Sequence, residues 1–300
     1  MFMFGIAKRR LVQIGTLVVS NSYIGSFFYN NIYQGWFKGV CVPFMNCYGC
    51  PLAVMSCPIG TLQHFVIIKA VPFLLIGFVG VIGLVVGRMF CGWLCPFGFI
   101  QEMLYKIKIK KFYPRKAFSY SKYVILAGLT LVVAYWVGEP WFCKLCPVGT
   151  LEAGIPIILW NPSGDIFTYG GSIISRVGFL FYTKLLILGG IVFTAILIHQ
   201  PFCRYICPMG AIWSVFNKFS LFRLWVRKDT CAFFYECHQG CPMEVQVHNS
   251  PNDLDCTRCL ECTKWKCKSI KFKLAWAEDQ TEQRHNHPQP NQEHVKERSA

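Results

Sequence analysis

Charged residues are scarce in this 300-residue chain, at 15%, and acidic residues are the scarcer kind, with 15 Asp and Glu against 30 Lys and Arg. Soluble domains carry about 25% charged residues, so this content, together with 54% apolar residues, excludes an ordinary soluble globule. The net charge of +15 does not indicate a nucleic-acid partner, because the basic residues flank apolar runs instead of forming a polar stripe. The composition predicts an α-helical integral membrane protein with no nucleic-acid partner.

The sequence also lacks a phosphate-binding loop, a dinucleotide fingerprint and a catalytic triad. Any chemistry therefore belongs to bound groups. The chain is instead rich in cysteine, with 17 residues, most of them in Cys-Pro and C-x2-C groupings. These groupings are typical of metal or cluster ligands and exclude a disulfide framework as the full explanation.

Four apolar stretches predict transmembrane helices, at residues 11–29, 65–86, 123–137 and 177–198. Such stretches are expected to cross a hydrocarbon core of about 30 Å. We interpret the first as an uncleaved anchor, since no clear small-x-small cleavage site follows it; a cleaved signal peptide is the alternative. Residues 151–160 are too few to cross and predict a re-entrant or interfacial segment.

Basic residues gather in alternate connections between these stretches. They occur at 8–10, between 88 and 122, and between 204 and 228, whereas the other connections hold few. The positive-inside rule predicts a multi-pass protein of the bacterial inner membrane with both termini in the cytoplasm. Residues 100–116 predict a helix on the inner surface or, alternatively, a plain basic loop.

A Cys-Pro-x-Gly unit recurs four times, beginning at Cys57, Cys95, Cys146 and Cys207. Proline suits the first helical turn, a thiolate before that turn meets free backbone N–H groups, and glycine permits close backbone approach. The predicted topology puts the first and third units outside and the second and fourth inside. The chain is therefore predicted to contain two internal repeats, with sites where the repeats meet.

Each inner unit follows a second cysteine, which gives the C-x3-C-P pairs Cys91/Cys95 and Cys203/Cys207. Two pairs supply four thiolates, the number that a [4Fe–4S] cluster takes. Inert buried cysteines are the alternative.

Six cysteines lie outside in the same topology, more than one cluster needs. Because the outer face is oxidising, disulfides or free thiols are the alternative to a cluster there. The predicted outer cluster ligands are Cys50, Cys57, Cys143 and Cys146, and the other two outer cysteines are Cys41 and Cys47.

The C-terminal part carries a C-x2-C-x2-C run at Cys256, Cys259 and Cys262, preceded by Cys241-Pro. This pattern predicts a [4Fe–4S] cluster on these four cysteines. Zinc is the alternative, but structural zinc normally uses two separated C-x2-C pairs.

A second cluster in this part is predicted from Cys231, Cys237 and Cys267. The pattern is incomplete, because Phe234 stands where another cysteine of the run belongs. Three cysteines suit a [3Fe–4S] cluster, or a [4Fe–4S] cluster completed by His238 or by a rearranged ligand.

With these motifs, the chain resembles the membrane ferredoxin-type proteins typified by NapH, together with MauN-like and NosR-like polyferredoxins, over residues 8–275. The resemblance implies four spans, two cytoplasmic C-x3-C-P motifs, a cytoplasmic ferredoxin domain, and quinol oxidation with electron delivery to redox partners. The outer cysteines and Phe234 depart from the family pattern.

We accordingly divide the chain into four parts. They are an N-terminal anchor and outer segment (1–40), a duplicated membrane domain with four Cys-Pro-x-Gly units (41–228), a small ferredoxin-like 4Fe-4S domain (229–276) and a disordered tail (277–300) with almost no apolar residues.

The leading hypothesis is an electron-transfer component of a quinol dehydrogenase complex with two to four [4Fe–4S] clusters. Its substrate is quinol, and its partners are the membrane quinone pool and cytochrome or ferredoxin-type redox subunits. The candidate quinone residues are His64, Lys69 and Lys184, with snorkelling lysines as the alternative. The competing hypotheses are an accessory protein that reduces a metal such as copper for oxidase maturation, and a redox sensor.

Overall fold

The computed structural model describes residues 2–29, 31–112, 114, 116–160, 177–226, 241–247, 249–264 and 270–275. The predicted disordered tail lies outside these residues. So does the predicted second ferredoxin cluster, with Cys231, Cys237 and Cys267.

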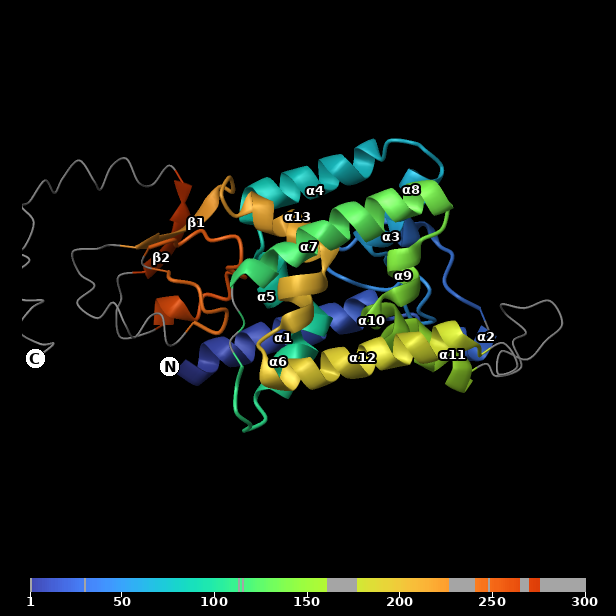
Figure 1. Cartoon of the computed structure of the whole chain (residues 1–300), viewed down its shortest axis with the longest axis horizontal. Helices are drawn as coiled ribbons and strands as arrows, with labels where there is room; N and C mark the ends of the chain where they lie inside the picture. Colours follow the sequence, from blue (N-terminus) through green and yellow to red (C-terminus); the bar gives the residue numbers. More distant parts are fainter. Residues whose placement is uncertain are drawn as a thin grey trace, which may run out of the picture.

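Helices make up most of the described chain, and the longer ones lie along one axis of the molecule (Figure 1). The first half contains α1 (Phe2–Ser20), α2 (Ser26–Tyr29), α3 (Pro58–Ile67), α4 (Phe73–Val86), α5 (Met89–Trp93) and α6 (Pro96–Tyr105). It is followed by α7 (Ser121–Ile125), α8 (Val133–Val137), α9 (Trp141–Leu145), α10 (Pro147–Gly149), α11 (Ile155–Trp160), α12 (Phe179–Leu197) and α13 (Pro208–Phe216).

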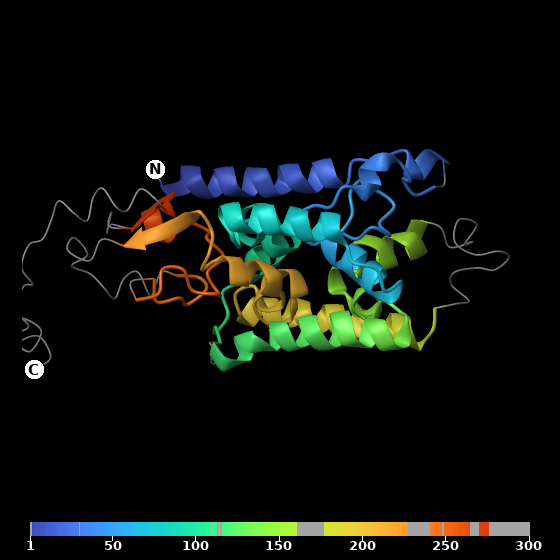
Figure 2. The same ribbon diagram turned by 90° about the horizontal axis from the view of Figure 1, so that it is seen from above.

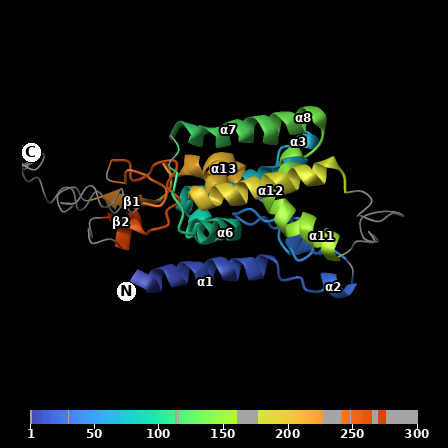
Figure 3. The same cartoon turned by 60° about the horizontal axis from the view of Figure 1, so that its bottom comes forward.

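Within the described residues, three π-helical segments extend these helices. Leu126–Val132 joins α7 to α8, Thr150–Gly154 joins α10 to α11, and Phe202–Ile206 precedes α13. The helix α1 lies along one side of the molecule and the α7–α8 helix along the opposite side (Figure 2). The helices α6, α12 and α13 lie between them (Figure 3).

In the part of the chain that the structure describes, two helices are long and apolar enough to cross a membrane by length and composition, Lys116–Val137 and Phe179–Leu197. They coincide with the third and fourth predicted stretches. The second predicted stretch is divided, because α3 ends at Ile67 and α4 begins after Pro72, with Lys69 at a left-handed φ of 57° between them. Pro72 disfavours a helical conformation at Val71 and lacks an N–H donor, which helps to separate the two helices. Lys69 therefore lies in a turn and not inside a helix.

The surfaces of these helices carry large apolar side chains with no protein cover. Leu74 on α4 is 84% exposed, Trp136 on α8 is 83% exposed and Phe179 on α12 is 88% exposed. Extensive uncovered apolar surface is unfavourable in water, and helices satisfy their own backbone groups in lipid. This exterior suits a hydrocarbon environment.

Each Cys-Pro-x-Gly unit begins a helix, as the sequence predicts. Cys57, Cys95, Cys146 and Cys207 are the N-cap residues of α3, α6, α10 and α13, each in extended backbone conformation with proline in the first turn. Steric contact also explains the glycine of this unit, as the fourth copy shows. A Cβ at Gly210 would lie 2.7 Å from the carbonyl oxygen of Cys203, so this position must be glycine for the two parts of the C-x3-C-P motif to pack.

A small separate core forms beyond α13. Strands β1 (Phe222–Val226) and β2 (Ile270–Leu274) pair antiparallel, with Leu224 opposite Phe272. Leu224 and Ile270 pack against residues from the 241–256 segment, namely Met243, Val245, Val247 and Cys256. This core holds the C-x2-C-x2-C run against the end of the helical part.

Candidate metal centres

Three cavities in the described chain are each lined by four cysteines. The ferredoxin site contains Cys241, Cys256, Cys259 and Cys262. The central site contains Cys91, Cys95, Cys203 and Cys207. The distal site contains Cys47, Cys57, Cys143 and Cys146.

The donor set of these sites fits iron–sulfur clusters. All 14 described cysteines are free thiols, so none of them is used in a disulfide with another described cysteine. Among the described residues, no three His, Cys, Asp or Glu side chains are grouped as ligands of a single metal ion. Four thiols spread around a cavity suit a polynuclear cluster better than zinc, which needs close tetrahedral ligands.

The central site brings together the two C-x3-C-P motifs, as the repeat predicts. Its walls are apolar, with Phe44, Phe97, Phe202 and Met209. The backbone N–H of Gly98 donates to Cys95 Sγ and that of Gly210 to Cys207 Sγ, each at 3.4 Å, and Gln101 Nε2 donates to Cys203 Sγ at 3.3 Å. Donors of this kind stabilise the negative charge of cluster-bound thiolates.

The cysteines that line the distal site differ at one position from the predicted set. Cys57, Cys143 and Cys146 line the cavity as predicted, but the fourth cysteine is Cys47. Cys50 is buried and does not line this cavity. Glu152 fixes the Cys47 loop, because its Oε2 accepts a hydrogen bond from the Cys47 N–H at 2.7 Å.

The ferredoxin site is built on a tight loop. Arg258 and Leu260, which alternate with its cysteines, have left-handed φ values of 50° and 59°. Burial raises the pKa of the Cys256 thiol to about 11, although the backbone N–H and side chain of Arg258 favour the thiolate. A bound cationic centre such as iron would favour the thiolate form of these sulfurs.

Sequence reasoning missed a second repeated feature, the residue six positions after each unit's cysteine. Gln63 Oε1 accepts from the Cys143 N–H at 3.2 Å, and Gln101 Oε1 accepts from the Phe202 N–H at 3.1 Å. Glu152 binds Cys47 as described, and Trp213 Nε1 donates to the Pro43 carbonyl at 3.1 Å. Each of these side chains fixes a distant segment beside a cysteine site. The shared offset within the repeat was the available signal.

A buried charge network joins the central site to the ferredoxin site. Arg88 donates to the carbonyls of Cys203 at 2.6 Å and Leu254 at 2.9 Å. Lys122 Nζ lies 2.7 Å from Asp255 Oδ1, and Arg88 lies 3.7 Å from the same oxygen. Burial alone would raise the pKa of Asp255, but Lys122 and Arg88 hold it below its usual value.

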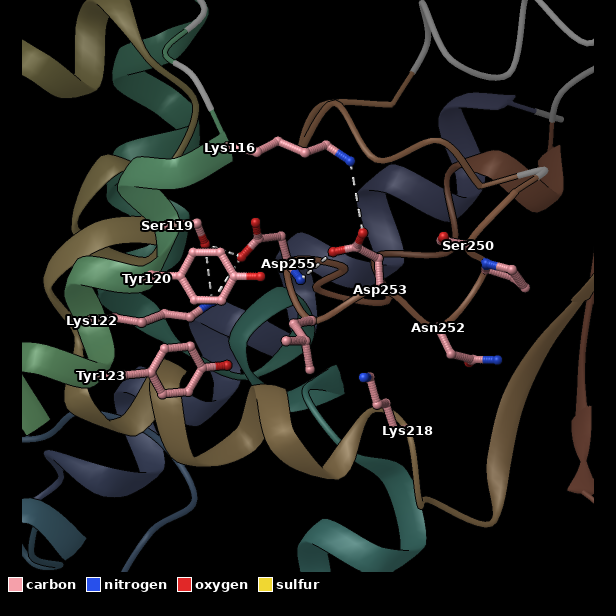
Figure 4. A pocket seen from close by; sticks show the side chains of 12 residues that line it. Lys116, Ser119, Tyr120, Lys122, Tyr123, Lys218, Ser250, Asn252, Asp253 and Asp255 are labelled. Atoms are coloured by element: carbon pink, nitrogen blue, oxygen red, sulfur yellow. Dashed lines mark hydrogen bonds and ion pairs between the residues drawn. The ribbon is translucent and has the colours of Figure 1, made fainter.

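Asp255 also borders a polar cavity at this junction (Figure 4). Ser119 donates a hydrogen bond to Asp255, and Lys116 lies 3.8 Å from Asp253. Tyr120 and Tyr123 line the wall that belongs to the α7 side. Asp253 and Asp255 are thus paired with Lys116 and Lys122, which holds the ferredoxin segment to the start of a candidate span.

The three candidate quinone residues are not brought together. His64 and Lys69 are exposed at the end of α3, and Lys69 Nζ lies 5.1 Å from the ring centre of Tyr135. Lys184 is half-buried and interacts electrostatically with distal-site cysteines, including Cys143. No contact found among the described residues joins Lys69 to Lys184.

Comparison with known proteins agrees with this chemistry. A family model described as "4Fe-4S binding domain" matches residues 68–116, 123–155 and 180–228. The ferredoxin-type protein NapH of Haemophilus influenzae is 24% identical over 55% of this chain and 50% of its own length. The methylamine utilization ferredoxin-type protein MauN of Methylorubrum extorquens is 26% identical over 52% of this chain and 47% of its own. The chain is a relative of these ferredoxin-type proteins.

The chain is also similar to MJ0750 of Methanocaldococcus jannaschii, with 29% identity over 74% of the chain and 87% of that protein. It spans about half the length of NapH and MauN. No solved structure matches it. The matched segments include all four central-site cysteines, together with Cys143 and Cys146 of the distal site.

Proposed function

We propose that this ferredoxin-type protein is an iron–sulfur electron carrier of the cytoplasmic membrane that oxidises quinol and passes the electrons to partner redox proteins. The observation that carries the proposal is the set of three cavities with four cysteines each. One [4Fe–4S] cluster per cavity supplies reversible one-electron storage. This assignment uses 12 of the 17 cysteines.

The chain's own residues bind the clusters and set their surroundings. The cysteines are the ligands, and the N–H groups of Gly98, Gly210 and Gln101 stabilise sulfur charge at the central site. Phe97 and Phe202 exclude water there. Burial and hydrogen bonds to sulfur are two of the factors that set a cluster's reduction potential.

The proposed orientation keeps both termini in the cytoplasm, which places the ferredoxin site and the lysines of its junction on that side. Quinol reaches the chain from the bilayer. Lys184, beside the distal site, is the one candidate quinone residue placed near cluster ligands.

The test is anaerobic purification of the full chain, followed by iron and sulfide analysis and EPR. Three clusters predict about 12 iron atoms per chain, with any cluster on Cys231, Cys237 and Cys267 adding to this number. Addition of quinol to membranes should then reduce EPR-detectable clusters. Clusters that quinol leaves oxidised would contradict the quinol assignment, and copper reduction without quinol would favour the accessory metal-reducing alternative.

A further inference from the structure

We infer that the three cysteine sites form one continuous path along which electrons cross the membrane inside this single chain, with Met45 as the contact between the distal and central sites. The inference rests on the proposed electron-carrier function and deepens it, because it assigns redox partners to both faces of the membrane.

The first junction is Met45, which lines both the distal and the central cavity. Its Sδ lies 3.7 Å from Sγ of Cys57, a distal-site cysteine. Its backbone N–H is hydrogen-bonded to Cys95, a central-site cysteine. Met45 is 5% exposed, so one buried residue touches ligands of two sites.

The loop that carries Met45 is held in this place from several directions. Trp213 on α13 donates to the carbonyl of Pro43. Asn46 Nδ2 donates to the Met55 carbonyl at 3.1 Å, and Asn46 Oδ1 accepts from Asn21 at 3.0 Å. The loop therefore inserts Met45 between the sites as a fixed part of the core.

The second junction is a close backbone contact between the central and ferredoxin sites. Gly92 follows Cys91 directly, and a Cβ built on it would lie 2.8 Å from the carbonyl oxygen of Thr257 and 3.5 Å from the Cα of Cys259. Next to it, Trp93 Nε1 donates to the Arg258 carbonyl at 3.1 Å. Glycine at position 92 thus permits the two ligand loops to touch.

The path follows the membrane-crossing direction. The ferredoxin site adjoins β1, the central site lies at the starts of α6 and α13, and the distal site lies at α3, α9 and α10. These elements follow one another along the long axis, and the α7–α8 helix and α12 run along the same axis (Figure 1, Figure 3). A row of sites parallel to two candidate spans connects the two faces.

The electron balance is simple. A one-electron carrier at one face is oxidised, an electron moves along the row, and a one-electron carrier at the other face is reduced. No covalent bond forms or breaks. Since no proton accompanies the electron along this path, each transfer moves one charge across the membrane.

The test uses the full chain with its clusters in phosphatidylethanolamine–phosphatidylglycerol vesicles that contain no quinone. Reduced ferredoxin, which cannot cross lipid, is added outside, and EPR follows each site after freezing. The fraction of the ferredoxin-site signal that becomes reduced gives the fraction of chains whose ferredoxin site faces the outside of the vesicle. In those chains, we expect the distal-site signal to be reduced as well.

The central site can be removed by replacing Cys95 and Cys207 with Ser. The ferredoxin-site signal should still be reduced, whereas distal-site reduction should be lost. Distal reduction at the parental rate would overturn the path. Absence of clusters, or clusters that quinol does not reduce, would instead contradict the proposed function.

Met45→Ala tests the junction without removing a ligand, with Met55→Ala in the same loop as its control, since Met55 packs on the core but lines neither cavity. We expect Met45→Ala to keep all cluster signals while slowing the reduction of the distal site in the vesicle experiment. Equal rates of distal-site reduction in the two variants would remove Met45 from the path.

Discussion

Cys47 and Cys50 lie three positions apart in one loop, yet only Cys47 lines the distal site. The loop folds back at this point, with the Cys50 N–H bonded to the Cys47 carbonyl at 3.0 Å. Cys50 is buried near Lys38. Two chemically identical residues in one turn therefore have different surroundings, which makes them a matched pair for mutagenesis.

We predict that Cys47→Ser removes the distal-site EPR signal, because a cluster there loses one of its four thiolate ligands. Cys50→Ser is the control and should retain that signal, since Cys50 does not line the cavity. Both variants should retain the central and ferredoxin signals. Loss of the distal signal in Cys50→Ser, with retention in Cys47→Ser, would reverse the assignment.

At the scale of single elements, the Cys-Pro-x-Gly helix start depends on the absence of a side chain at its glycine. Gly210→Ala would place a methyl group 2.7 Å from the Cys203 carbonyl oxygen, a backbone atom that cannot easily move. At Gly190 on α12, a Cβ would have no atom within 4 Å, so this position offers a glycine without the same constraint.

We predict that Gly210→Ala lowers central-cluster occupancy and the thermal midpoint of the chain, because overpacking a tight site typically costs about 1–3 kcal/mol. Gly190→Ala should leave both unchanged or slightly improved. Iron content and the temperature at which the central EPR signal is lost are the measurements. Equal behaviour of the two variants would show that the close approach at Gly210 is unimportant.

The junction between α7 and the ferredoxin segment depends on Asp255. Asp255→Asn leaves Lys122 and Arg88 buried without their counter-charge, which typically costs about 3–5 kcal/mol. We expect the ferredoxin-site signal to be lost at a lower temperature. Asp253→Asn is the control, because Asp253 pairs with the exposed Lys116 and not with a buried cation, and it should have little effect.

The pH dependence of this junction follows from the depressed pKa of Asp255. A carboxyl group whose pKa is lower in the folded state stabilises the fold fully above its unfolded pKa of about 4, and the contribution is lost as the pH falls through the folded value. The difference between the parent and Asp255→Asn should therefore be constant at neutral pH and shrink in acid. A difference that grows in acid would contradict this pairing.

The elements show which features the sequence could predict. The central site was predictable because two motifs share one spacing, Cys91/Cys95 and Cys203/Cys207, and the repeat required them to meet. The choice of Cys47 over Cys50 was not predictable, because it depends on the fold of an irregular loop. The helix break at Lys69 could not be predicted either, because the residues on both sides of this turn are apolar and form one continuous apolar stretch in the sequence.

At the scale of the whole molecule, the two candidate spans give a topology that can be tested. Lys116 begins one span, and Gly138, in a left-handed turn, follows its other end. A fluorescent protein that folds only in the cytoplasm should fluoresce when it is fused after Ala275. Alkaline phosphatase is active only on the outer face of the membrane, and it should be active when it is inserted after Gly138. The opposite pattern would invert the proposed orientation.

The distal and central sites each draw two ligands from one half of the helical part and two from the other. This arrangement sets an order of biogenesis. Neither site is complete when the first half leaves the ribosome: the distal site awaits Cys146 and the central site awaits Cys207. Delivery of the proposed clusters would therefore follow insertion of the later helices, and each cluster would then tie the early part of the chain to the late part.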